Sequence, residues 1–172
     1  MIEEHNLEED SKWKKIGVGG LAIFLLILVT SYILASYPIF PIIASLSESQ
    51  TANNKTINLD TFSIIFTENT YEQLQGYYYK DLSVEMVVCL KGVKGEDYLI
   101  NEIYQPEIIE QAHNHVSFKP CSEDTLILLH SHPLRHCIAS QQDLLTLSSI
   151  KEKNQNSIMV IMCEPDRFSV YR

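Results

Sequence analysis

Residues 125–143, TLILLHSHPLRHCIASQQD, contain the pattern on which the fold and the chemistry of this chain depend. The short apolar run Thr125–His130 is typical of a buried β-strand. His130 and His132 stand at i and i+2, and in extended backbone such side chains point the same way. Pro133 favours that extended geometry at His132. Two imidazoles that converge in this way suit a zinc ion.

The segment after the two histidines predicts a helix over Ser140–Lys153. Its apolar side is expected to consist of Leu144, Leu145, Leu147 and Ile150. Asp143 falls in the first turn, where its carboxylate can supply an oxygen ligand. Two histidines and one carboxylate leave a fourth position open for water, as a catalytic zinc site requires. Taken by itself, Ser140-Gln-Gln-Asp143 is more simply a capping sequence at the start of a helix.

A lone acidic residue lies in an upstream strand that we expect over Ser83–Leu90, SVEMVVCL. Glu85 is the single charge between Val84 and the apolar run Met86–Leu90. A carboxylate in a buried strand is costly unless something pairs with it, and a metal-held water would do so. The alternative is that Glu85 lies on a solvent-exposed face of its strand.

Together these residues resemble the JAMM/MPN family of zinc metalloproteases. The family signature is a Glu on an upstream strand, then His-x-His-Pro, six residues, and Ser-x-x-Asp. This chain has His130-Ser-His132-Pro133, six residues, and Ser140-Gln-Gln-Asp143, with Glu85 as the upstream acid. The resemblance covers roughly residues 61–172. It implies an α/β (α+β) fold in which a curved mixed β-sheet is sandwiched by helices, the cytidine-deaminase-like JAMM/MPN fold.

The resemblance also implies a role for each site residue. His130, His132 and Asp143 would bind one Zn²⁺ per chain. Glu85 would take a proton from the zinc-activated water and pass it to the leaving amine, and Ser140 would stabilise the oxyanion. The loop residue His136 would contact substrate, or it is simply a surface residue.

These roles predict a membrane-anchored zinc metallopeptidase or isopeptidase that hydrolyses a peptide or isopeptide bond in a protein substrate. That substrate would include a ubiquitin-like conjugate. The alternative function is a non-catalytic, membrane-tethered MPN-like interaction module. A zinc deaminase fits poorly, because the sequence contains neither His-x-Glu nor Pro-Cys-x-x-Cys.

The rest of the domain reads mainly as strands. Further strands are expected over Thr61–Phe66, Asp97–Tyr104 and His113–Phe118, and a final hairpin over Ser157–Cys163 and Phe168–Tyr171. A helix is expected over Thr67–Lys80, with Thr67 as its cap. A second His-x-His, His113 and His115, lacks the proline and the helix carboxylate, so we expect a surface strand there.

The four cysteines show no Cys-x-x-Cys spacing, which argues against a zinc ribbon. In an extracytoplasmic domain they can form disulfides in three full pairings, and the sequence does not select one. Cys121 and Cys137 flank the metal-binding stretch, so that pair is the first to test.

A second stretch excludes an ordinary soluble chain, because residues 16–47 contain no charged side chain. Ile16–Tyr37 would form a helix of about 33 Å, enough to cross a hydrocarbon core of about 30 Å. Pro38 and Pro41 are expected to end it. A cleaved signal peptide is the alternative, but its apolar stretch is usually shorter, roughly 7–15 residues.

Cations beside this stretch predict its orientation. Lys12, Lys14 and Lys15 precede it, and the next cation is Lys55. The positive-inside rule therefore keeps the N-terminus in the cytoplasm and sends the soluble domain outside. Ubiquitin-like conjugates are expected inside, so the face on which the domain acts stays open at this point.

Charge and composition set the remaining bounds. The chain has 172 residues, 13 Lys+Arg against 22 Asp+Glu and a formal net charge of −9, which argues against nucleic-acid binding. The expected organisation is a charged N-terminal tail (1–15), a transmembrane helix in contact with lipid (16–37), a flexible polar linker (38–58) and the metalloprotease domain (59–172).

Overall fold

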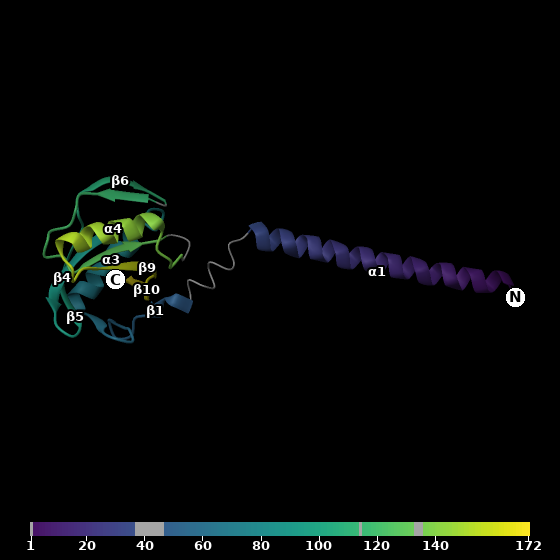
Figure 1. The fold of residues 1–172 in the computed structure, drawn as a ribbon, viewed down its shortest axis with the longest axis horizontal. Coiled ribbons are helices and arrows are strands. Elements are labelled where there is room, and N and C mark those ends of the chain that lie inside the picture. The colour runs from purple at the N-terminus through teal and green to yellow at the C-terminus, as the bar shows by residue number, and fades with distance from the viewer. Residues whose placement is uncertain (1, 37–46, 114, 133–135) are drawn as a thin grey trace. The chain divides into compact units, whose positions relative to one another are not determined.

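The computed structural model describes residues 2–36, 47–113, 115–132 and 136–172 (Figure 1). It divides into two compact units, residues 1–40 and 41–172. Pro38 and Pro41, which we expected to end the first helix, and Pro133 lie outside the described residues.

The first unit contains α1, a continuous helix over Ile2–Ser36. Within it, Lys14–Ser36 is long and apolar enough to cross a membrane, and the large apolar side chains of this stretch are exposed. A helix of this kind near an N-terminus is either an anchor or a signal sequence. The helix also runs through the charged tail, whose Glu, Leu and Lys residues have high helix propensity.

The second unit is an α+β domain. Its strands are β1 (Gln50–Thr51), β2 (Thr56–Asn58), β3 (Ser63–Phe66), β4 (Val87–Lys94), β5 (Tyr98–Tyr104), β6 (Ile108–Ala112), β7 (His115–Phe118), β8 (Ile127–Ser131), β9 (Ile158–Glu164) and β10 (Arg167–Tyr171). Its helices are α3 (Glu68–Lys80) and α4 (Gln141–Lys153). The expected α+β class is confirmed.

Eight strands form one mixed sheet in the order β1-β10-β9-β8-β4-β5-β3-β2. The sheet is nearly closed into a barrel, because the edge strands β1 and β2 contact each other and a bridge joins Asn53 to Thr56. β8 and β9 pair in parallel, so α4 connects them as a crossover. β6 and β7 form a separate two-stranded ribbon.

Helices cover both faces of this sheet. On one face, Val88 and Leu129 pack with Leu74 of α3. On the other face, Leu128 and Met159 pack with Leu147 of α4. Because side chains alternate along a strand, neighbouring residues of β4 and β8 serve opposite layers. Figure 1 shows α4 between the main sheet and the β6–β7 ribbon.

Several sequence-based predictions were wrong in detail. The flexible linker was expected to reach residue 58, but residues 50–51 and 56–58 are strands of the main sheet. β4 begins at Val87 rather than at Ser83, so Glu85 lies just before the strand. Leu144 and Leu145 are exposed instead of lining the core, where α4 packs mainly through Leu147.

The disulfides do not include the pair that was the first to test. Cys121 is bonded to Cys89, and Cys137 to Cys163, so Cys121 and Cys137 do not pair with each other. β4 brings Cys89 to the segment that follows β7, and β9 brings Cys163 to the segment that precedes α4. These contacts are made by distant strands, which is why nearness in sequence was a poor guide.

Removing either disulfide is expected to destabilise the domain by about 3–4 kcal/mol, because each closes a loop of roughly 30 residues in the unfolded chain. The sequence separations are 32 residues for Cys89–Cys121 and 26 for Cys137–Cys163, so the double Cys→Ser variants should lose similar amounts. Denaturant unfolding of the full-length protein in detergent, followed by near-ultraviolet circular dichroism, measures both losses. Unchanged unfolding midpoints would contradict the two bonds.

Candidate metal site

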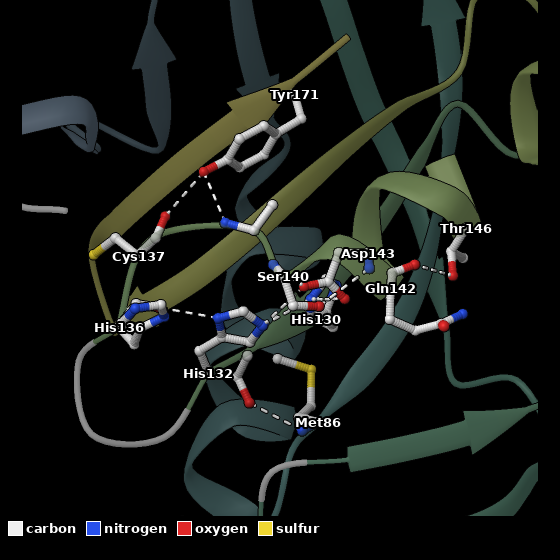
Figure 2. Close-up of polar contacts among 12 residues, drawn as sticks. Met86, His130, His132, His136, Cys137, Ser140, Gln142, Asp143, Thr146 and Tyr171 are labelled. Carbon is white, nitrogen blue, oxygen red and sulfur yellow. Dashed lines mark hydrogen bonds and ion pairs between the residues drawn. The ribbon is translucent and has the colours of Figure 1, made fainter. Parts of the chain in front are cut away.

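The two histidines predicted as ligands converge at the end of β8. His130 pairs with Val87 of β4 and lies on the face of the sheet that α4 covers, together with Leu128. His132 follows the strand, and its side chain lies beside that of His130, with their Nε2 atoms 3.1 Å apart. Both residues are buried. The convergence expected from the i, i+2 spacing is therefore present (Figure 2).

Asp143 completes the group from the first turn of α4. Its Oδ1 lies 3.2 Å from Nε2 of His130, and its Oδ2 lies 3.4 Å from Nε2 of His132. Among the His, Cys, Asp and Glu side chains of the described residues, these three are the ones whose ligand atoms lie close enough together to hold a metal ion. The sequence prediction placed all three together, and the structure does the same.

The spacing of these atoms suits a tetrahedral ion. Zinc bonds of about 2.0–2.1 Å in tetrahedral geometry separate neighbouring ligand atoms by about 3.3 Å. The two Nε2 atoms are 3.1 Å apart, and His130 and His132 lie 3.2 and 3.4 Å from different oxygens of Asp143, so one atom from each residue lies within 4.8 Å of the others. Two imidazoles and one carboxylate are also a donor set that zinc uses in catalytic sites. The residues present therefore fit a zinc ion in both distance and donor chemistry.

A main-chain contact sets the tautomer of His132. Its Nδ1 lies 3.0 Å from the carbonyl oxygen of His136, and a carbonyl can only accept a hydrogen bond. Nδ1 therefore carries the proton, and in the neutral ring the lone pair of Nε2 points at His130 and Asp143. Such an outer contact commonly orients a metal-bound histidine.

The two kinds of side chain in the group shift each other's pKa in opposite directions. Burial opposes ionisation of Asp143, but hydrogen bonds from His130 and His132 outweigh it and lower the pKa of Asp143 far below its usual value. Burial also opposes the charge on His132, yet the hydrogen bond to Asp143 raises the pKa of His132 overall. A positive charge beside Asp143 favours its ionised form, and a bound cation would supply such a charge.

Asp143 acts as a helix cap at the same time. The N–H of Ser140 donates to Oδ2 of Asp143 at 2.7 Å, and the N–H of Asp143 donates to Oγ of Ser140 at 3.2 Å. The two readings of Ser140-Gln-Gln-Asp143 are therefore compatible, because the capping box itself aims the carboxylate. Accepting this bond leaves the Ser140 hydroxyl hydrogen able to donate elsewhere.

Glu85 is buried beside the group, with about 9% of its surface exposed. Burial raises the pKa of Glu85 above its usual value, and the nearby His132 and His130 partly counter that effect. The exposed-face alternative for Glu85 is therefore wrong. A raised pKa makes the protonated form of Glu85 easier to reach than that of an exposed glutamate.

Two contacts that the sequence did not reveal hold the backbone around Glu85. Ser131 and Met86 form a reciprocal pair: the N–H of Met86 donates to Oγ of Ser131 at 2.9 Å, and the N–H of Ser131 donates to the Met86 carbonyl at 2.8 Å. Nε2 of Gln111 on β6 donates to the Glu85 carbonyl at 2.6 Å. Ser131 is the middle residue of His-x-His, and in extended backbone its side chain faces away from the two histidines. A small hydroxyl residue at that position was the feature of the sequence that could have indicated this contact.

The group opens into a cleft of about 810 Å³ between α4 and the segment that begins with β7. Glu85, His130, His132, Ser140 and Asp143 all line this cleft, and so does His136. The ring of His136 stacks on that of His132 at 6.0 Å. All five site residues predicted from the sequence therefore line one surface that solvent can reach.

The second His-x-His pair lies at the tip of the ribbon and is exposed, as expected, but the strand begins at His115 and His113 lies in the turn before it. His113 and His115 are exposed, and Nδ1 of His113 lies 3.0 Å from the Ser83 carbonyl. Both line the cleft, but among the described residues they join no metal-binding group. They therefore serve as matched controls for the ligand histidines.

A scan of the chain against protein-family models finds no matching family, and a search of curated proteins finds no significant match. The chemistry of the site therefore rests on its own residues.

The full-length protein is expected to bind one zinc ion per chain after dialysis, as measured by mass spectrometry of the metal. His130→Ala and His132→Ala should abolish stoichiometric binding, because each removes one of three ligands. The controls H113A and H115A should keep it. Zinc retained by His132→Ala would contradict the site.

Proposed function

We propose that this chain is a zinc metallopeptidase of JAMM/MPN type that hydrolyses a peptide or isopeptide bond in a protein substrate. The observation that carries the proposal is the convergence of His130, His132 and Asp143 beside the buried Glu85 in one open cleft. The agreement of the motif spacing with the family signature, and a mixed sheet covered by helices on both faces, support it.

Each side chain has a separate task in this proposal. A zinc ion held by the three ligands supplies a Lewis acid and lowers the pKa of water to about 7. Glu85 accepts the proton of the attacking water and delivers it to the leaving nitrogen. A carboxyl group whose pKa is raised by burial suits both halves of that transfer.

Ser140 is proposed to stabilise the oxygen that becomes negative when water attacks the carbonyl. Its hydroxyl lines the cleft and sits at the N-terminus of α4. The capping bond from Asp143 fixes the position of Oγ while its hydrogen stays available to donate. One such donor is typically worth about 3–4 kcal/mol of transition-state stabilisation.

The two disulfides suggest that the domain lies outside the cytoplasm, where such bonds form and persist. The lysines before α1's apolar stretch favour the same side. We therefore propose that α1 is a membrane anchor and that the substrate is an extracytoplasmic protein. A ubiquitin-like conjugate is the substrate if the domain faces the cytoplasm instead.

Glu85→Gln is expected to lower hydrolysis about 10²–10⁴-fold, because the amide cannot accept the proton of water. Zinc content should stay at the wild-type level, since Glu85 is not a ligand. The matched control E102Q changes an exposed glutamate on β5 and should keep full activity. Turnover is measured with a quenched fluorescent peptide library and with a ubiquitin-like protein fused through its C-terminus.

Wild-type turnover by the Glu85→Gln variant would contradict this mechanism. A zinc-loaded wild-type protein that cleaves neither substrate class, yet captures a protein partner, would favour the non-catalytic interaction module.

A further inference from the structure

The segment 136–140, which we call the ligand-bridging segment, orients two of the three ligands from its two ends. At one end, the His136 carbonyl accepts the Nδ1–H of His132 at 3.0 Å. At the other end, the N–H of Ser140 donates to Oδ2 of Asp143 at 2.7 Å. Figure 2 shows both contacts on the same stretch of chain. A shift of this segment would therefore disturb a histidine and the carboxylate together.

The ligand-bridging segment is itself fastened to the C-terminal hairpin. The disulfide Cys137–Cys163 joins it to β9, and both sulfur-bearing residues are buried. Tyr171 on β10 fastens it a second time: its hydroxyl oxygen accepts the N–H of Ala139 at 2.9 Å, and its O–H donates to the Cys137 carbonyl at 3.3 Å (Figure 2). The main chain on both sides of Ile138 is thus held by one phenol.

The contacts of Tyr171 and Cys163 do not involve the metal-ligand side chains themselves. Tyr171 and Cys163 contact the ligand-bridging segment, whereas the ligand atoms belong to His130, His132 and Asp143. Metal affinity depends on holding ligands close to their bound geometry, and loss of an outer contact typically weakens binding about 10–100-fold. Contacts that hold the ligand-bridging segment in place therefore affect metal affinity indirectly, because that segment orients His132 and Asp143.

We propose that Tyr171 and the Cys137–Cys163 disulfide are positioning residues that set the zinc affinity of the site by clamping segment 136–140 to β9 and β10. This inference rests on the zinc site of the proposed function but not on its peptidase activity.

The chain offers a matched control for each half of the clamp. The Tyr98 hydroxyl donates to the Asn156 carbonyl at 2.9 Å, so Tyr98→Phe also removes a phenol–backbone hydrogen bond. The Cys89–Cys121 disulfide closes a loop of similar length and bonds neither end of the ligand-bridging segment. Variants at these positions should cost comparable stability without moving the ligands.

The test measures zinc dissociation constants by competition with a chromogenic chelator, on the full-length protein in detergent. Tyr171→Phe and Cys137→Ser/Cys163→Ser should bind zinc about 10–100-fold more weakly. Tyr98→Phe and Cys89→Ser/Cys121→Ser should stay within about twofold of wild type. The visible spectrum of the cobalt-loaded protein should shift for the first pair of variants and match wild type for the second.

Each outcome decides the proposal. Wild-type affinity and an unshifted cobalt spectrum in Tyr171→Phe would overturn the clamp, and so would an equal loss in Tyr98→Phe, which would indicate general destabilisation. If the double cysteine variant fails to fold, the comparison of the two tyrosine variants decides. A wild-type protein that binds no zinc contradicts the proposed function, whereas zinc binding that ignores Tyr171→Phe contradicts the clamp alone.

Discussion

The contact between the Asp143 carboxylate and the two imidazoles is the interaction on which the site depends. Three polar groups within 3.4 Å of one another in a largely buried position would be costly without a compensating charge. The fold meets that constraint from three directions. β8 and the residue after it present His130 and His132, α4 presents Asp143 through its cap, and the segment before β4 presents Glu85.

The architecture around this group holds the three side chains in place. α4 follows β8 and precedes β9, which pair in parallel, and the hairpin β9–β10 contacts segment 136–140 through Cys163 and Tyr171. The Cys137–Cys163 disulfide adds a covalent link at the same place. A site built in this way is preorganised, so binding energy is not spent on ordering the ligands.

The sequence predicted the ligands because their spacing is local. The i, i+2 histidines need only extended backbone, and Asp143 needs only a helix that begins at Ser140. The features that the sequence could not reveal depend on contacts between residues far apart in the chain. The partners of Cys121 and Cys137 follow from β4 and β9. Residues 50–51 and 56–58 are strands because they pair with β10 and β3 at the sheet edges.

The central claim is that His130, His132 and Asp143 hold a zinc ion without help from sulfur. X-ray absorption at the zinc edge of the purified full-length protein tests it most directly. The account predicts nitrogen and oxygen neighbours at about 2.0–2.1 Å, with the scattering of two imidazole rings. A zinc–sulfur distance of about 2.3 Å would contradict it, because a cysteine ligand requires at least one of the two disulfides to be broken in the zinc-bound protein.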